Sequence, residues 1–175
     1  NISGYQVSTA SRARNSSNIA TIVTGAAHGL VTNDVVSIRN VGGSGYNAEG
    51  VTVTVLDTTT FSYSSTGSSE STTADTGGVV VKPTTIHQAV SGTDDKDEIY
   101  LAAMNVDSDD VEIQVEWGGG GDTYVIARGL VPGRAFMYRI VAGELLQNGL
   151  YIKAFTLTHG KAGKVNIVGF VNRDE

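Results

Sequence analysis

Cysteine is absent from the 175-residue sequence, proline occurs only twice and tryptophan only once. Without cysteine, neither disulfides nor thiolate-bound metal sites can stabilise the fold. No segment approaches the roughly 18 consecutive apolar residues of a membrane-spanning helix, so we expect no membrane partner. Acidic residues outnumber basic ones and give a formal net charge of −6, which argues against nucleic acid as the main partner.

What the sequence has in abundance is glycine, together with short segments in which apolar and polar residues alternate. The 22 glycines supply turns, and hydrophobic residues make up 40% of the chain, which is enough for a core. The clearest segment runs from Val51 to Val55, where alternate residues are valine and therefore share one face of a strand. No segment keeps a helical apolar stripe for three turns. The sequence therefore predicts an all-β protein.

Residues 1–17 are polar and lack apolar periodicity, so we interpret them as an N-terminal arm or an extended lead-in. Arg12 and Arg14 in this arm are candidates for contacts with an acidic neighbouring protein. The alternative is a solvated tail that contacts nothing.

Residues 18–82 are predicted to form a small β-module, either a barrel or a sandwich. The expected strands are 18–24, 35–39, 50–56, 60–64 and 79–81, with a long polar loop at 67–78. So many short strands over about 65 residues are typical of compact barrels and sandwiches. We expect a linker at 82–85, because Pro83 lacks a backbone donor and because the excess of acidic residues falls mainly beyond this point.

Residues 83–175 are predicted to form an eight-stranded antiparallel β-sandwich, similar to a jelly roll. The recognisable strands are 86–90, 98–106, 111–117, 123–127, 135–141, 150–157 and 164–172. In the strand at 111–117 the apolar residues occupy odd positions and point inward, while Glu112, Gln114 and Glu116 point outward. Trp117 ends this alternation and precedes four glycines. It is therefore either a core residue, which its alternation favours, or a carbohydrate-stacking platform.

Two strands of this second domain are apolar on both faces, although the outer faces of a lone sandwich are expected to contact water. Phe136 and Tyr138 lie on one of these strands, and Tyr151 and Phe155 lie on the other. Either the first domain or a loop covers these side chains, or a neighbouring subunit does. The second alternative makes the four aromatic residues candidate subunit contacts and predicts a homo-oligomer, of which a trimer is one form.

No arrangement of side chains that carries catalysis or holds a metal can be assembled from the sequence. His28, His87 and His159 lie far apart, and none has a histidine two or four residues away. The acidic turn at 107–110 lacks the glycine and glutamate of a calcium loop, and the 160–164 segment lacks the hydroxyl residue of a phosphate loop. We therefore expect no enzymatic activity, no metal and no cofactor.

The first half of the chain contains a series of short motifs that stand in the same order in a β-module of many tailed-bacteriophage virion proteins, which it resembles. The motifs are Ser11-Arg12-Ala13-Arg14, Asn18-Ile19-Ala20-Thr21, His28-Gly29-Leu30, Asp34-Val35-Val36, Gly45-Tyr46-Asn47, Thr60-Phe61-Ser62-Tyr63 and Ala74-Asp75-Thr76-Gly77-Gly78. One departure is Asn33, where a glycine often precedes the aspartate, but asparagine tolerates the same backbone conformation. The segment 164–172 is similar to the last strand of small β-sandwich virion proteins.

The resemblance implies a non-enzymatic structural component of the virion that is made in the cytoplasm of the host bacterium. We expect a capsid decoration protein that sits on the capsid surface, binds the major capsid protein and clamps neighbouring subunits. The alternatives are a neck, tail or fibre protein, including one that contacts host glycan. The family pattern brings no catalytic residues with it, and for His28 it favours a structural role at a turn.

Overall fold

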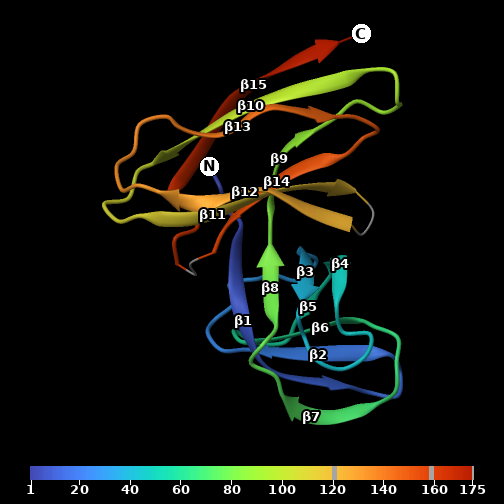
Figure 1. The fold of residues 1–175 in the computed structure, drawn as a ribbon. Helices are drawn as coiled ribbons and strands as arrows, with labels where there is room; N and C mark the ends of the chain where they lie inside the picture. Colours follow the sequence, from blue (N-terminus) through green and yellow to red (C-terminus); the bar gives the residue numbers. More distant parts are fainter. Residues whose placement is uncertain (120–121, 158–159, 175) are drawn as a thin grey trace. The chain divides into compact units, whose positions relative to one another are not determined.

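The computed structural model describes residues 1–119, 122–157 and 160–174. Every regular element in these ranges is a β-strand, which confirms the all-β fold class (Figure 1). The chain divides into two compact units. We call Gln6–Lys82 the small module, and we call Asn1–Tyr5 together with Pro83–Glu175 the sandwich unit. The small module is thus inserted into the sandwich unit after its first five residues.

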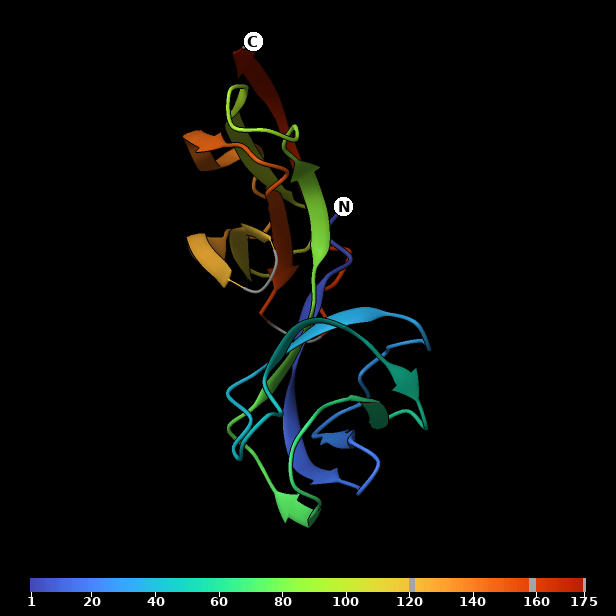
Figure 2. The same ribbon diagram turned by 90° about the vertical axis from the view of Figure 1, so that its right-hand side faces the viewer.

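The strands of the small module form one strongly curved sheet around a common interior (Figure 2). Their order is β4-β3-β8-β1-β2-β6-β5, and β7 pairs with β1. The strands are β1 (Tyr5–Arg14), β2 (Ile19–Thr24), β3 (Val35–Arg39), β4 (Ala48–Thr52), β5 (Thr54–Val55), β6 (Thr60–Ser64), β7 (Glu70–Ala74) and β8 (Val79–Lys82). Strands β3 and β6 begin and end where the alternation predicted them.

The interior of the small module is filled by the inward residues of these short strands. Ile22, Val36, Ile38, Tyr46 and Phe61 are completely buried. The turn before β3 is closed by Asn33, whose φ of 76° is the left-handed conformation that the motif usually assigns to glycine.

The predicted N-terminal arm is wrong, because residues 5–14 form β1, the strand on which the module is assembled. Strand β1 pairs with β2 along one edge and with β7 and β8 along the other. Its inward residues include Thr9 and Arg14, which are buried despite being polar. Val7 is the only apolar residue among the three buried residues of this strand, so the apolar pattern in the sequence could not reveal it.

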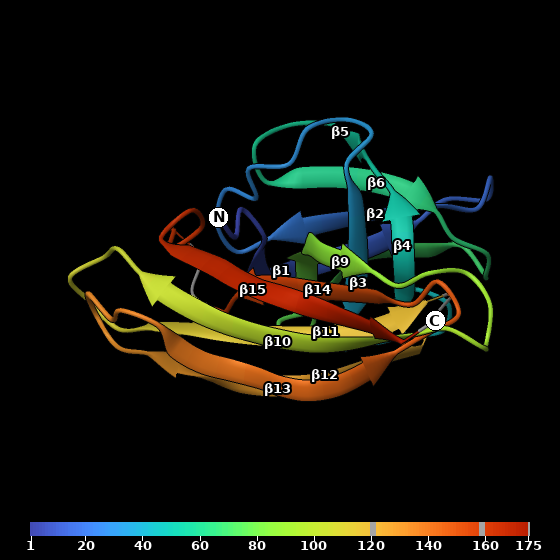
Figure 3. The ribbon, with the colours of Figure 1, turned by 90° about the horizontal axis from the view of Figure 1, so that it is seen from above.

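The sandwich unit consists of two facing sheets (Figure 3). One sheet has the order β13-β10-β15, and the other has the order β12-β11-β14-β9. The strands are β9 (Thr84–Gln88), β10 (Lys96–Asn105), β11 (Val111–Gly119), β12 (Asp122–Val131), β13 (Tyr138–Leu146), β14 (Tyr151–Thr156) and β15 (Val165–Asp174). The described part of residues 83–175 thus contains seven strands rather than eight.

The N-terminal residues contribute to this sandwich. The amide of Ile2 donates to the Val165 carbonyl at 2.7 Å, and the Ile2 side chain is completely buried in the core between the sheets. Tyr5, the first residue of β1, pairs with Thr156 of β14 in parallel. The core that Ile2 joins is built from β-branched and aliphatic side chains, among them Ile99, Val111 and Ile152.

Candidate functional site

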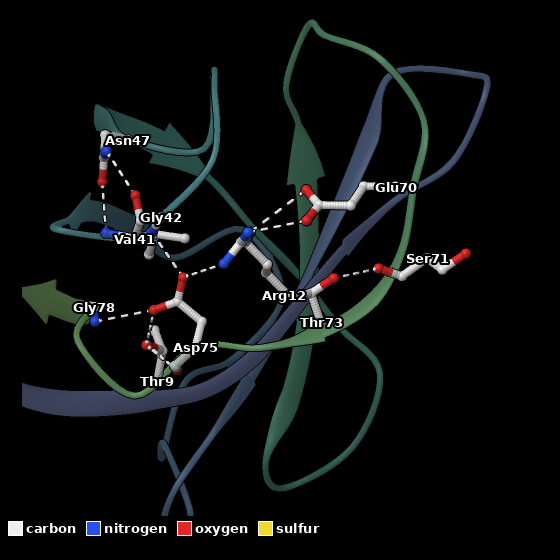
Figure 4. A network of polar contacts seen from close by, with 10 residues as sticks. All are labelled: Thr9, Arg12, Val41, Gly42, Asn47, Glu70, Ser71, Thr73, Asp75 and Gly78. Carbon is white, nitrogen blue, oxygen red and sulfur yellow. Dashed lines mark hydrogen bonds and ion pairs between the residues drawn. The ribbon is translucent and has the colours of Figure 1, made fainter.

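Arg12 is the centre of a polar network inside the small module (Figure 4). Its Nη1 atom lies 2.6 Å from Asp75 Oδ2, and its Nη2 atom lies 2.9 Å from Glu70 Oε1. Asp75 also accepts a hydrogen bond from the Gly42 amide at 2.7 Å, and its backbone carbonyl accepts one from the Thr9 hydroxyl at 2.8 Å. The network therefore connects β1 with the strand β7 and with the glycine-rich turn before Tyr46.

A second network surrounds Tyr46, whose ring is completely buried. The guanidinium of Arg14 lies over this ring, and its Nη2 atom donates to the Ser65 hydroxyl at 2.9 Å and to the Ser44 carbonyl at 3.0 Å. The Tyr63 hydroxyl donates to the Tyr46 carbonyl at 2.5 Å. Together these contacts fix the turn between β3 and β4 against β6.

The environment of these groups shifts their pKa values in the directions expected for internal, paired side chains. Burial alone would raise the pKa of Asp75, but the Gly42 amide and Arg12 outweigh it and hold the pKa below its usual value. Burial raises the pKa of the Tyr63 hydroxyl to about 12. At neutral pH, Asp75 is therefore ionised and the Tyr63 hydroxyl is protonated in the folded module.

The two networks bring together residues from four of the seven motifs that carry the resemblance, namely Arg12, Arg14, Tyr46, Tyr63 and Asp75. Their polar residues bond to one another within the module. His28 is buried as well: its Nδ1 atom accepts a hydrogen bond from the Leu30 amide at 3.0 Å, and its ring meets Phe61 edge-on. The motifs thus specify a fold, and their chemistry is internal.

This placement corrects the role predicted for the two arginines. Arg14 is 4% exposed, and Arg12 is engaged by two carboxylates of its own module. Neither guanidinium is directed at a neighbouring protein. The sequence-based interpretation went wrong because it placed both residues in an arm rather than in a strand.

The four aromatic candidates in the sandwich unit lie in different environments. Phe136 is 85% exposed in the turn before β13, and Tyr138 at the start of β13 is also exposed. Tyr151 is half-buried, with Lys153 Nζ 5.4 Å from the centre of its ring. Phe155 is completely covered. Phe136 and Tyr138 are therefore the most accessible of the four to a partner, Tyr151 is partly accessible and Phe155 is not accessible.

A groove of about 680 Å³ lies on the outer face of the β13-β10-β15 sheet, and sequence reasoning missed it. Its lining includes Tyr100 and Ala102 of β10, Val168 and Phe170 of β15, and Arg139 of β13. The signal was present in the sequence, because the strands around Tyr100 and Phe170 are apolar at outward as well as inward positions.

Several carboxylates of the sandwich unit are paired with neighbouring side chains. Gln114 and Glu116 were predicted to point into solvent, but both are buried, and the Gln114 amide donates to Glu116. Glu112 lies 3.0 Å from Arg128 at the surface. In the acidic turn, Lys161 Nζ lies 3.0 Å from Asp107. Among the described residues, no group of three or more His, Cys, Asp or Glu side chains is arranged to hold a metal ion, and His159 lies outside these residues.

Trp117 packs against the core between the sheets and is partly buried, as its alternation with Val115 predicted.

No helix long and apolar enough to cross a bilayer occurs in the described ranges. Comparison with protein families, with curated proteins and with solved structures found no match to this chain.

Proposed function

We propose that this protein is a non-enzymatic structural component of a tailed-phage virion, located on the capsid surface, where it binds the major capsid protein. The observation that carries the proposal is the ordered set of motifs between Ser11 and Gly78, which resembles the virion module. The polar residues of these motifs hold the small module together. A module that recurs for its fold rather than for a reaction is what a structural role requires.

The surfaces of the sandwich unit also support a binding role. Phe136, Phe170 and Leu145 are each more than half exposed, although apolar side chains of this size are usually covered in a protein that has no partner. The carboxylates that could serve as an acid–base pair are instead bonded to neighbouring side chains, Glu116 to Gln114 and Glu112 to Arg128. Contact with other virion proteins accounts for the exposed apolar side chains.

The test is to locate the protein on purified virions by electron microscopy, with an antibody or with a fused marker domain at the C-terminus. Density distributed over the capsid supports the decoration role. Density confined to the neck, tail or fibres contradicts the capsid location but agrees with a virion role. Absence of the protein from virions contradicts the whole proposal.

A binding experiment tests the surface independently. Purified protein is mixed with particles that lack it, and the particles are sedimented. We expect Phe136→Asp to lower co-sedimentation at least several-fold, because this side chain is the most exposed aromatic one among those whose burial the structure describes in the sandwich unit. Val31→Asp, at an exposed position of the small module, is the matched control. Equal loss for both variants would contradict a contact at Phe136.

A further inference from the structure

The outer face of the β13-β10-β15 sheet is a separate surface with its own pattern. Strand β10 alternates strictly: Ile99, Leu101 and Ala103 are buried in the core, while Glu98 and Tyr100 stand on the opposite face. Strand β10 pairs with β15 in continuous register and with β13 across two register shifts, and the outward residues of the three strands share one face of this sheet.

The centre of this surface is apolar. Tyr100 stacks on Phe170 of the neighbouring strand, with ring centres 4.8 Å apart and planes inclined by 11°. Phe170 remains 59% exposed, and Val168 beside it is 39% exposed. These side chains line the groove described above. A continuous apolar patch on a sheet face is stabilised when a second sheet packs on it about 10 Å away.

One acidic and one basic group flank this centre at equal distances along β10. Glu98 lies two residues before Tyr100, and Arg139 pairs with Ala102, two residues after Tyr100. The side chain of Arg139 is exposed and has neither a hydrogen bond nor an ion pair with a described residue, while its backbone pairs with β10. Glu98 accepts hydrogen bonds from the Tyr100 hydroxyl at 2.8 Å and from the Asn172 amide at 3.2 Å, and is half-exposed.

We propose that this outer face is the contact surface of a symmetric dimer of the chain. A two-fold axis that lies midway between the two facing sheets, runs perpendicular to the strands and passes over Tyr100 exchanges the two ends of β10. It places Glu98 of each copy opposite Arg139 of the other, so that the contact forms twice. The same operation packs the Tyr100–Phe170 centre of one copy on that of its partner. The face is therefore complementary to itself in charge, with an apolar centre in both copies.

This arrangement is specific to a two-fold contact. A cyclic trimer uses two different surfaces on each subunit, and it does not bring one face onto an identical face. The dimer does not depend on the proposed virion role, because its evidence lies wholly in the sandwich unit. Phe136, in the turn before β13, stays available for a separate partner.

The test uses a pair of charge reversals in the full-length protein, with mass measured by sedimentation velocity over a range of concentrations. We expect the wild type to form a species of twice the 18.2 kDa chain mass. Glu98→Arg alone and Arg139→Glu alone each create two like-charge contacts in their own dimers. Each is therefore expected to raise the dimer dissociation constant by about tenfold or more. An equimolar mixture of the two variants restores two attractive contacts, so the mixture forms heterodimers while each variant alone remains monomeric.

Two further variants separate this contact from a loss of fold. Phe170→Asp places a charge in the apolar centre and is expected to abolish the dimer. Val125→Asp, at a similarly exposed position on β12 of the other sheet, leaves it unchanged. Circular dichroism checks that all variants remain folded. The proposal is overturned if the wild type stays monomeric or forms a trimer. It is also overturned if the mixture of the two charge variants contains no more dimer than either variant alone.

Discussion

The guanidinium of Arg14 lies 4.0 Å from the centre of the Tyr46 ring, and both side chains are buried in the small module. A planar guanidinium can stack on the ring and donate sideways to Ser65 and to the Ser44 carbonyl at the same time. A lysine ammonium at this position cannot keep both kinds of contact. The pairing explains why a strand without apolar periodicity is nevertheless the central strand of its sheet.

We expect Arg14→Lys to lower the free energy of unfolding of the small module by about 1–3 kcal/mol, because the stacking and the hydrogen bonds are lost while a charge stays buried. The exposed Arg128 pairs with Glu112 at the surface, so Arg128→Lys should change stability by less than about 0.5 kcal/mol. Amide hydrogen exchange of β2 and β6 measures the small module separately from the sandwich unit. If the two substitutions lower the free energy of unfolding equally, the contact of Arg14 with Tyr46 does not stabilise the small module more than a surface ion pair does.

The stability of the small module should also fall at alkaline pH because of Tyr63. The folded pKa of this hydroxyl is raised to about 12, whereas an unfolded tyrosine ionises near pH 10. The stabilising contribution is therefore complete below about pH 10 and is lost as the pH rises through the folded value. Tyr63→Phe removes this dependence, together with the hydrogen bond to the Tyr46 carbonyl. Urea unfolding at a series of pH values from 8 to 12 measures how the free energy of unfolding depends on pH. If it falls as steeply in Tyr63→Phe as in the wild type, Tyr63 is not the group responsible.

In the sandwich unit, Asp97 is the group that should govern acid stability. It is completely buried, with Arg173 Nε at 2.8 Å and His87 Nε2 at 2.7 Å. The hydrogen bond from Arg173 lowers its pKa most, against the opposing effect of burial, and His87 lowers it further. The stabilisation is therefore present above the unfolded pKa near 3.9 and is lost as the pH falls through the lower folded value.

Asp97→Asn is expected to weaken the sandwich unit at neutral pH, because Arg173 loses its charged partner, and to flatten the decline of stability below about pH 4. Asp94→Asn, at an exposed position in the turn before β10, is the control and should leave the acid decline unchanged. Exchange rates of the β10 amides report this unit. If the free energy of unfolding of Asp97→Asn falls as steeply below pH 4 as that of the wild type, other carboxylates cause the loss of stability in acid.

Gly169 should be intolerant of any side chain. A Cβ atom at this position would lie 2.0 Å from the Tyr100 carbonyl oxygen, and this oxygen belongs to the backbone of the paired strand. We expect Gly169→Ala to cost about 1–3 kcal/mol by forcing β15 away from β10. Gly129→Ala on β12 meets no atom within 4 Å and should be nearly neutral. Thermal unfolding of the two variants gives the comparison, and similar melting temperatures would contradict the close approach of the two strands.

The sequence predicts those strands best whose buried residues are apolar. Strands β3 and β6 have the expected bounds because Val36, Ile38 and Phe61 alternate with polar residues and are buried. Strand β7 was expected to be a loop. Its residues are serine, threonine and glutamate, and it is held by pairing with β1, which the sequence does not encode locally.

The candidate sites show the same limit. The motif around Tyr46 could be identified from the sequence, but its partners Arg14 and Ser65 are brought to it only by strand pairing. Gln114 and Glu116 alternate with apolar residues and were expected to contact water, yet both are buried. Alternation distinguishes two faces of a strand, but it does not report whether the polar face is covered.

The insertion of the small module between Tyr5 and Pro83 has a consequence for the order of folding. Residue Ile2 must reach Val165, and the Thr84 hydroxyl bonds to the Gly4 amide at 2.8 Å, so the sandwich needs its earliest residues beside much later ones. In an unfolded chain, closing such a loop costs entropy that grows with its length. Once the module has folded, β1 and β8 are paired and the two ends of the insertion are held near each other. A folded module therefore shortens the loop that the sandwich unit has to close, so substitutions that destabilise the contact of Arg14 with Tyr46 should also slow the folding of the sandwich unit.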